Sequence, residues 1–356
     1  MSDLSQQWAE QVRGAAADCT PLELRGGGTK AFLGRQPAGN VLDTRGHRGV
    51  VSYEPTELVV TVRAGTPLAE LEALLAERNQ MLAFEPPHFG DAATVGGMVA
   101  AGLSGPRRQA AGAVRDFVLG VKILDGRGEV LSFGGQVMKN VAGYDVSRVI
   151  AGSLGTLGVI LDVSLKVLPR PVAEATLRFD LDEGGAIDRL NEWGGQPLPV
   201  SGSACCDGAM HVRLSGAEAA VRAALQRLGG ERVADEDAAR FWRDIREQRA
   251  RFFEQVGDGV LWRLSVPSSA APLRVAGSQL IEWGGAQRWL LTDAGAERVR
   301  ARAAELGGHA LAFRGGDRQG DVFHPLPAPL MTIHRRLKQA FDPAGIFNPG
   351  RLYAGL

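Results

Sequence analysis

The chain has 356 residues, and its 40 lysines and arginines balance 40 aspartates and glutamates, which gives a formal net charge of zero. A balanced charge lacks the positive field with which most nucleic-acid-binding proteins attract phosphates, so we expect no nucleic-acid partner. Because the sequence has no run of about 18 apolar residues and no basic start followed by an apolar segment, we expect a cytoplasmic protein without direct membrane insertion.

The length predicts two domains, because a domain takes roughly 150 residues and each part would be large enough for a core of its own. Early in the first domain, Leu58 to Ala64 (LVVTVRA) predicts a strand. Thr66 is typical of a helix N-cap and Pro67 of the first helical residue, and the apolar stripe that follows is typical of a helix. We therefore expect a strand followed by a helix.

The second part of the first domain also predicts strands. Residues 118–133 predict a hairpin, because two apolar runs flank the turn sequence Asp-Gly-Arg-Gly. From residue 159 to 167, apolar and mostly polar residues alternate, which predicts a strand with one buried face. Pro169 and Pro171 end this strand, so we expect the first domain to cover residues 1–171.

Beyond Pro171 the chain repeats a pattern of short glycine-containing sequences. Trp-Gly-Gly occurs at 193–195 and again at 283–285, and each copy precedes a predicted strand, a predicted helix and a Gly-Gly pair. We therefore expect residues 172–320 to form two β-α-β-β-α-β-like halves that share one antiparallel sheet, with helices on a single face. Between the halves, residues 235–255 predict one amphipathic helix packed on that sheet, and a helix that docks a partner is the alternative.

The sequence offers little for binding a metal. Its three cysteines, Cys19, Cys205 and Cys206, are expected to be reduced thiols, and they are fewer than the four that an iron–sulfur cluster or a structural zinc usually takes. None of the six histidines forms an H-x-H, H-x-x-x-H or H-E-x-x-H pair. We expect no metal in this chain, so any iron–sulfur cluster must belong to another subunit.

Glycine is concentrated in the first part of the chain, where it forms four rich segments. In the first, Arg25 to Lys30 (RGGGTK), successive N–H groups can turn toward an anion such as a diphosphate, because no Cβ obstructs them. A tight turn without a ligand is the alternative for this segment alone. Its spacing fits neither the Walker loop nor G-x-G-x-x-G, so we expect neither a nucleoside triphosphatase nor a standard Rossmann fold.

The other three segments follow in order. In residues 86–102, Thr94 can cap a short helix whose first turn contains Gly96 and Gly97, which leaves N–H groups and the positive end of the helix dipole for an anion. Residues 139–145 (KNVAGYD) form the third segment, and residues 151–160 (AGSLGTLGVI) form the fourth and run directly into the long strand. Four such segments in one domain indicate that the backbone closely approaches a ligand.

Together, RGGGTK, PP-x-x-G-x-A-A-T-V-G-G, KNVAGYD and GSLGTLGVI resemble the FAD-binding domain of the vanillyl-alcohol oxidase/PCMH flavoprotein family. The ending from 341 to 351 (FDPAGIFNPGR) resembles the family's C-terminal return to that domain, so we assign residues 321–356 to the return. The resemblance implies an α+β fold, in which a PCMH-type FAD-binding domain of two subdomains carries a smaller cap domain of antiparallel sheet and helices.

The resemblance also implies a cofactor site. Residues 25–30 and 94–98 would hold the FAD diphosphate, and residues 139–145 and 152–160 would line the flavin and the adenosine half. We expect noncovalent FAD, because Thr29 and Lys30 stand where members with covalently bound flavin often have histidine. The implied cofactor-binding residues are Arg25, Gly26, Gly27, Gly28, Thr29, Lys30, Pro87, Thr94, Val95, Gly96, Gly97, Met98, Lys139, Asn140, Gly143, Tyr144, Asp145, Gly152, Gly155, Thr156, Gly158, Val159, Ile160 and Asn348.

Within the family, the length and the short middle domain are most similar to the FAD-binding E subunits of bacterial glycolate oxidase (glycolate dehydrogenase). Such subunits work with a longer flavoprotein sibling and an iron–sulfur subunit. The resemblance therefore implies an FAD-dependent oxidoreductase subunit that oxidises glycolate, a small 2-hydroxy acid, to glyoxylate and passes electrons to a partner. It also implies a place at the inner membrane surface through these partners.

The catalytic residues stay unassigned, because we do not find the histidine-rich segment that supplies a metal site and a base in larger relatives. His88 stands where many relatives have a carboxylate or another polar residue, and its role is open. Arg314, Arg318, His324 and Arg335 are candidate substrate contacts, although their pattern is more typical of solvated charge. Two alternatives remain: a self-sufficient dehydrogenase of another 2-hydroxy acid, and a flavin-dependent assembly subunit without a substrate site.

Overall fold

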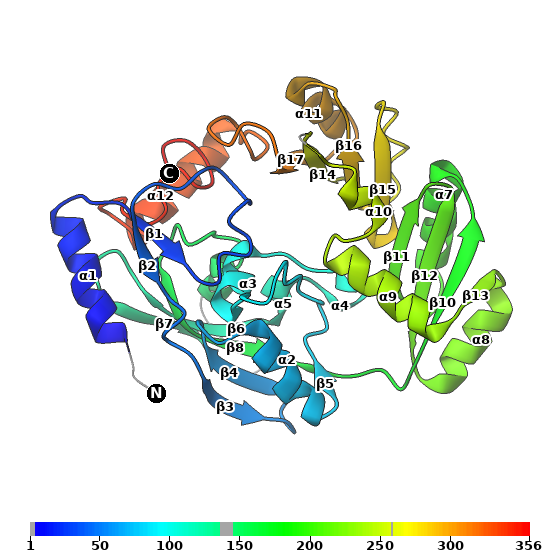
Figure 1. Cartoon of the computed structure of the whole chain (residues 1–356), viewed down its shortest axis with the longest axis horizontal. Helices are drawn as coiled ribbons and strands as arrows, with labels where there is room; N and C mark the ends of the chain where they lie inside the picture. The colour runs from blue at the N-terminus through cyan, green and yellow to red at the C-terminus, as the bar shows by residue number, and fades with distance from the viewer. Residues whose placement is uncertain (1–3, 136–144, 258) are drawn as a thin grey trace.

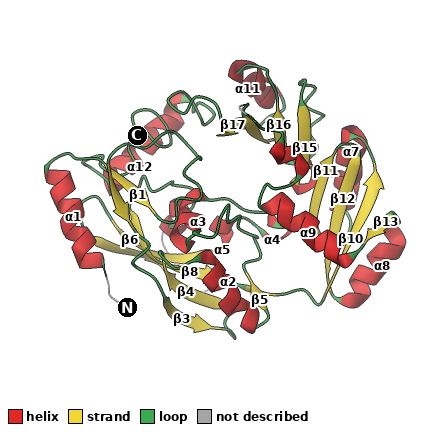
Figure 2. Cartoon of the chain, viewed as in Figure 1, coloured by secondary structure: helices red, strands yellow, loops and turns green. Residues whose placement is uncertain are grey.

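The computed structural model describes residues 4–135, 145–257 and 259–356, and these contain one five-stranded and one eight-stranded sheet. Figure 1 shows the five-stranded sheet on one side of the molecule and strands β10 to β13 on the other. Helices flank both sheets (Figure 2). The expected α+β class is therefore confirmed. Two further sheets, β1 with β2 and β5 with β9, have two strands each.

The first sheet is antiparallel, in the order β3-β4-β8-β6-β7, and the predicted strands and hairpin are present in it as β4, β6, β7 and β8. The elements up to residue 169 are α1 (Ser5–Ala17), β1 (Leu22–Arg25), β2 (Asn40–Asp43), β3 (Val50–Glu54), β4 (Val59–Arg63), α2 (Leu68–Glu77), β5 (Gln80–Met81), α3 (Val95–Ala101), α4 (Arg108–Ala111), α5 (Val114–Phe117), β6 (Val118–Leu124), β7 (Val130–Gly134), α6 (Val146–Ile150), β8 (Val159–Lys166) and β9 (Leu168–Pro169).

One detail of the predicted helix was wrong. Helix α2 begins at Leu68, and Pro67 rather than Thr66 occupies its N-cap position. The Thr66 hydroxyl accepts the N–H of Gly49 at 2.9 Å and donates to the Arg63 carbonyl at 2.7 Å, so it stabilises the turn before the helix. The helix is held chiefly by its apolar face, since Leu68, Leu71 and Leu75 are fully buried in the core over the five-stranded sheet.

The second sheet is antiparallel, in the order β13-β10-β12-β11-β15-β16-β14-β17. Its elements and the helix that follows are β10 (Ala173–Asp180), α7 (Glu183–Gly194), β11 (Val200–Cys206), β12 (Ala209–Gly216), α8 (Glu218–Leu228), β13 (Glu231–Val233), α9 (Asp235–Arg246), α10 (Arg251–Glu254), β14 (Leu261–Ser265), β15 (Ser278–Glu282), the 3-10 turn η1 (Trp283–Gly285), β16 (Gln287–Leu291), α11 (Ala296–Glu305), β17 (His309–Arg314) and α12 (Ala328–Phe341). The boundaries at 171 and 320 stay a prediction.

The two halves are less alike than the sequence predicted. The first half follows the β-α-β-β-α-β order, but the second half has no helix between β14 and β15, where residues 266–277 are irregular. The Trp-Gly-Gly copies are out of register: residues 193–195 end α7, whereas residues 283–285 turn the chain between β15 and β16. The second turn depends on glycine, because Gly284 has a φ of +64°.

The helices cover both faces of this sheet, which corrects the expectation of a single face. Helices α7, α8 and α11 pack on one face around Met210, Val212 and Leu264. Helices α9 and α10 lie on the other, inner face, where the Trp242 indole donates to the Thr176 hydroxyl at 2.9 Å. Residues 235–255 form two helices rather than one, because Gln248 adopts a φ of +54° between them.

The inner face of the eight-stranded sheet packs against the first domain. Leu103 and Leu154 of the first domain share one buried cluster with Trp289 and Phe313 of the sheet. The C-terminal segment returns to the first domain, where Phe347 pairs in parallel with Leu22 of β1. Among the helices described, none is long and apolar enough to cross a bilayer.

Candidate functional site

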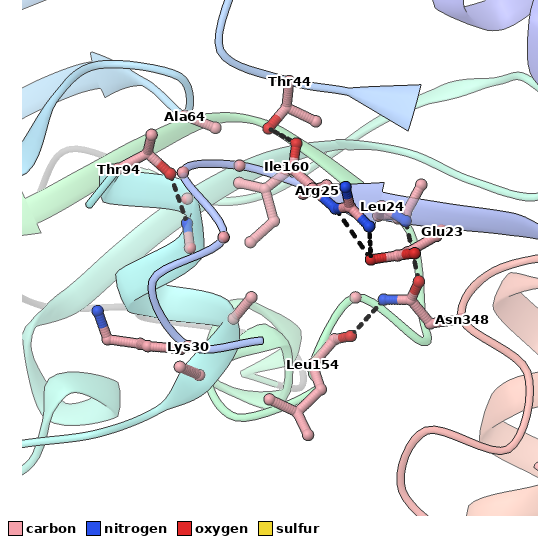
Figure 3. A pocket seen from close by; sticks show the side chains of 18 of the residues that line it. Glu23, Leu24, Arg25, Lys30, Thr44, Ala64, Thr94, Leu154, Ile160 and Asn348 are labelled. Carbon is pink, nitrogen blue, oxygen red and sulfur yellow. Dashed lines mark hydrogen bonds and ion pairs between the residues drawn. The ribbon is translucent and has the colours of Figure 1, made fainter. Parts of the chain in front are cut away.

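An open cavity of about 860 Å³, including solvent at its mouth, lies where β1, α3 and the loop before β8 meet. Figure 3 shows Thr94, Ile160 and Asn348, which come from distant parts of the sequence, around this cavity. Its walls are built from the first, second and fourth glycine-rich segments together with the C-terminal return.

The first glycine-rich segment forms a wall of free backbone donors. The N–H groups of Gly27, Gly28 and Thr29 donate to no acceptor in the part of the chain that the structure describes. Gly28 has a φ of +70°, which favours glycine, and a Cβ there would meet no atom within 4 Å. Successive free N–H groups of this kind make an anion-binding concavity, so the loop is suited to a phosphate.

Gly27 has a different role from the expected one. A Cβ on Gly27 would lie 1.5 Å from the carbonyl oxygen of Ala92 and 3.2 Å from the nitrogen of Ala93. The glycine therefore lets the first segment contact the backbone of the second. A Cβ on neighbouring Gly26 would lie 2.5 Å from Oγ1 of Thr94, so two consecutive glycines hold the two walls together.

The start of α3 confirms one prediction and corrects another. Oγ1 of Thr94 accepts the N–H of Gly97 at 3.2 Å, as expected of an N-cap. The other early donors are also paired, because the N–H of Val95 bonds to Thr66 and the N–H of Gly96 bonds to Ala64. The expectation of bare N–H groups at this helix was therefore wrong, and the free donors lie in the first segment.

Asn348 connects two walls of the cavity from the C-terminal return. Its Oδ1 accepts the N–H of Leu24 at 2.9 Å, and its Nδ2 donates to the carbonyl of Leu154 at 2.6 Å (Figure 3). Gly155 lies close by, where a Cβ would come within 2.7 Å of that same Nδ2. Asn348 thus positions β1 and the loop before β8 relative to each other, and its side chain is almost fully buried.

Positive charge collects along the cavity. Burial, with the nearby charges of Arg318 and Arg25, lowers the pKa of Arg351 to about 10, and Glu23 opposes this effect. Nε of Arg351 is buried without a hydrogen-bond partner among the described residues. Burial also lowers the pKa of Lys30 to about 8. A guanidinium with an orphaned nitrogen that lines the same cavity as free N–H groups fits the negative diphosphate of FAD.

The structure brings together most, but not all, of the predicted site residues. Those that line the cavity are Arg25, Gly26, Gly27, Gly28, Thr29, Lys30, Thr94, Gly96, Gly97, Gly155, Gly158, Val159, Ile160 and Asn348. Lys139, Asn140, Gly143 and Tyr144 lie outside the described residues. That the lining residues bind FAD stays a prediction, which the geometry makes specific.

The remaining predicted residues do not line this cavity, and each has a local reason. Val95 and Met98 are buried in the core over the five-stranded sheet. The Thr156 hydroxyl donates to the Ser153 carbonyl, and Asp145 accepts from Ser147 and pairs with Arg148. Two further residues complete this set: Gly152, which packs on Gly102, and Pro87, which lines a second cavity.

Sequence reasoning missed several lining residues. Arg351 belongs to the FNPGR string, but nothing in the sequence indicated that its guanidinium faces the first glycine-rich segment. Apart from Glu23, the other missed residues are small or apolar and carry no signal of their own. The missed lining residues are Glu23, Leu24, Ala31, Thr44, Ala64, Ala100, Ala101 and Arg351, whereas Leu154 lies within the predicted segment 152–160.

The residues whose role was open do not line the cavity, and His88 and Arg318 have structural partners. Nε2 of His88 lies 3.0 Å from a carboxylate oxygen of Glu72, away from the cavity. The Arg318 guanidinium donates to the carbonyls of Gly34 and Ala31, so it fastens the loop after the first segment. Arg314, His324 and Arg335 do not line the cavity either. In the described ranges, no three His, Cys, Asp or Glu side chains are grouped to hold a metal, and all three cysteines are free.

The sequence matches known families in two places. Residues 5–134 match the FAD binding domain family, and residues 326–352 match the C-terminal domain of FAD linked oxidases. Over 354 residues the chain is 52% identical to the glycolate oxidase subunit GlcE of Escherichia coli strain K12, with 99% of both chains covered. It is also 31% identical over 160 residues to the glycolate oxidase subunit GlcD of Bacillus subtilis strain 168, across 44% of this chain and 34% of that protein.

Solved structures share the fold. A 4-ethylphenol oxidase from Gulosibacter chungangensis superposes with a TM-score of 0.69 at 14% identity, covering 99% of this chain and 88% of that one. An alkyldihydroxyacetonephosphate synthase gives a TM-score of 0.67 at 15% identity, covering 96% and 74%. At these identities the likeness concerns the fold alone. The cavity walls lie within the two matched sequence regions, apart from the loop that precedes β8 and the first residues of β8.

Proposed function

Because this chain belongs to the family of the glycolate oxidase subunit GlcE, we propose that it is the FAD-binding subunit of a complex that oxidises glycolate to glyoxylate. The 52% identity over 99% of both chains carries this proposal. The membership also confirms the resemblance seen in the glycine-rich segments, and it makes the chain an FAD-dependent oxidoreductase subunit.

The cavity supports a specific arrangement for the cofactor. Free N–H groups of Gly27, Gly28 and Thr29 would bind the diphosphate, and Arg351 would add a positive charge. When bound, FAD supplies the acceptor for the two electrons that leave the substrate. The protein positions this group, and we propose that it does so without a covalent bond.

The composition of the chain favours partners that take up the electrons. Its three cysteines are too few for an iron–sulfur relay. The second relative, GlcD, is likewise named as a glycolate oxidase subunit. We therefore propose a longer flavoprotein sibling and an iron–sulfur subunit as partners. These would hold the complex at the inner face of the membrane.

Turnover tests this assignment. The isolated chain is expected to give little glycolate oxidation with an artificial electron acceptor, because we propose that turnover takes place in the assembled complex. Adding the sibling and the iron–sulfur subunit is expected to restore turnover, measured as acceptor reduction per flavin. Rapid turnover by the isolated chain, unchanged by the partners, would instead establish a self-sufficient dehydrogenase. Restored turnover that does not require this chain's FAD would indicate an assembly subunit.

A further inference from the structure

A second, smaller cavity, of about 310 Å³ including solvent at its mouth, lies between the inner face of the eight-stranded sheet and two loops of the first domain. Pro87 and Phe89 come from one loop, and Leu103 to Pro106 come from the other. The second cavity lies next to the FAD cavity. Nζ of Lys30, which lines the FAD cavity, lies 5.5 Å from the ring centroid of Phe89, which lines the second.

One wall of this second cavity carries an arginine without an anionic partner. Nε of Arg263 donates to Oε1 of Gln287 at 2.6 Å, but its two terminal nitrogens bond to no described residue, and it makes no ion pair with one. Its guanidinium lies near Trp283 and Trp289, 5.2 Å and 5.9 Å from their ring centroids. The aromatic rings thus hold the guanidinium plane of Arg263 in place, and its two terminal nitrogens can donate to a ligand.

The same wall carries the carboxylate of Glu282, of which only one oxygen accepts hydrogen bonds from the described residues. Oε2 of Glu282 accepts from Nε1 of Trp289 at 2.6 Å and from Nε2 of Gln287 at 3.0 Å. Oε1 accepts no hydrogen bond from the residues that the structure describes, although Glu282 is only 4% exposed. Burial raises the pKa of Glu282 to about 7, against the opposing effects of these hydrogen bonds and of Arg263.

Gln287 holds the two charged groups apart on one face of the sheet. Its amide oxygen accepts from Arg263 while its amide nitrogen donates to Glu282. The cation and the carboxylate line one cavity and yet do not pair within 4 Å. Because both groups line the same cavity and each keeps hydrogen-bonding capacity, this arrangement favours a ligand that bonds to both at once.

We infer that this second cavity binds a small 2-hydroxycarboxylate between Arg263 and Glu282. The carboxylate of the ligand accepts from the terminal nitrogens of Arg263, and its hydroxyl donates to Oε1 of Glu282. The choice of ligand rests on the proposed function, whereas the two unpaired groups come from the geometry alone. The apolar side chains of Phe89, Leu103 and Phe313 also line this cavity.

Ligand binding to the purified FAD-loaded chain tests this inference, with glycolate and acetate as probes. Acetate lacks the hydroxyl, so the ratio of the two dissociation constants reports the contact with Glu282. Tryptophan fluorescence under anaerobic conditions is a suitable readout, because Trp283 and Trp289 flank Arg263. We expect glycolate to bind at least about tenfold more tightly than acetate, since hydrogen bonds to charged groups are the strong ones.

Two variants separate the contacts. Glu282→Gln is expected to lose most of the preference for glycolate while acetate binding persists. Arg263→Met is expected to weaken both ligands by about tenfold or more, and Arg263→Lys replaces it if the methionine variant does not fold. Matched controls lie on α7, where Arg189 stacks 5.9 Å from Trp193 and pairs with Glu192. Arg189→Met and Glu192→Gln are expected to bind both ligands as the wild type does.

The outcomes distinguish this inference from the proposed function. A chain that holds FAD and supports turnover in the complex, but binds no glycolate or binds glycolate and acetate equally, would overturn the second cavity as a substrate site. Unchanged affinities in folded Glu282→Gln and Arg263 variants would do the same. Loss of FAD or of turnover in the wild type would instead contradict the proposed function.

Discussion

Gly27→Ala is expected to weaken FAD binding by about a hundredfold, because the new methyl group would lie 1.5 Å from the Ala92 carbonyl oxygen. To relieve this overlap, the first and second glycine-rich segments must move apart. The free N–H groups of Gly28 and Thr29 would then no longer face the same space as α3. Titration of FAD-stripped chains with FAD, followed by flavin fluorescence, measures the effect.

Gly14→Ala is the matched control, because a Cβ on Gly14 in α1 would meet no atom within 4 Å. This variant is expected to bind FAD like the wild type and to gain about 0.5–1 kcal/mol of stability, since alanine favours the helix over glycine. Circular dichroism verifies that both variants fold. Wild-type FAD affinity in a folded Gly27→Ala chain would show that contact between the two segments does not build the site.

Lys338→Met is expected to lower the free energy of unfolding by about 3–5 kcal/mol, because it leaves a buried carboxylate unpaired. Nζ of Lys338 donates to Oδ2 of Asp342 at 2.7 Å and to the carbonyls of Thr156 and Phe347 at 2.9 Å and 2.7 Å. Asp342 is only 1% exposed and also accepts the N–H of Phe347. This buried network fastens the C-terminal return to the loop before β8.

Urea unfolding measures this effect, and Arg335→Met on the same helix is the control. Arg335 is exposed, so its replacement is expected to change the free energy of unfolding by no more than about 0.5 kcal/mol. We also expect Lys338→Met to disturb the position of Asn348, because both residues hold the C-terminal return against the cavity. If Lys338→Met were as stable as Arg335→Met, the buried ion pair would not anchor the return.

Local patterns in the sequence predicted much of the first domain. The hairpin of β6 and β7 follows from its turn residues, and β8 follows from alternating burial. The Thr94 cap follows from the residue type and its place before an apolar run. These features depend on residues that are close in the sequence, so a single sequence is enough to predict them.

Features that depend on distant contacts could not be predicted in this way. The sequence did not show that a helix is absent after β14. The two Trp-Gly-Gly copies look alike in the sequence, but they lie at different places relative to the strands. Gly27 lines the predicted cavity, but the need for glycine at this position comes from Ala92, which only the fold brings close. Arg351 and Asn348 reach the cavity through the C-terminal return, and no local pattern shows where their side chains lie.

The flavin content of the wild-type chain tests the central claim most directly. The chain is purified without added cofactor, and its flavin is released by acid or heat. The released flavin is then identified by chromatography and counted per chain. We predict a yellow protein that releases one FAD per chain, and no FMN, without proteolysis. A correctly folded chain that is colourless and takes up no FAD when it is supplied would contradict the account.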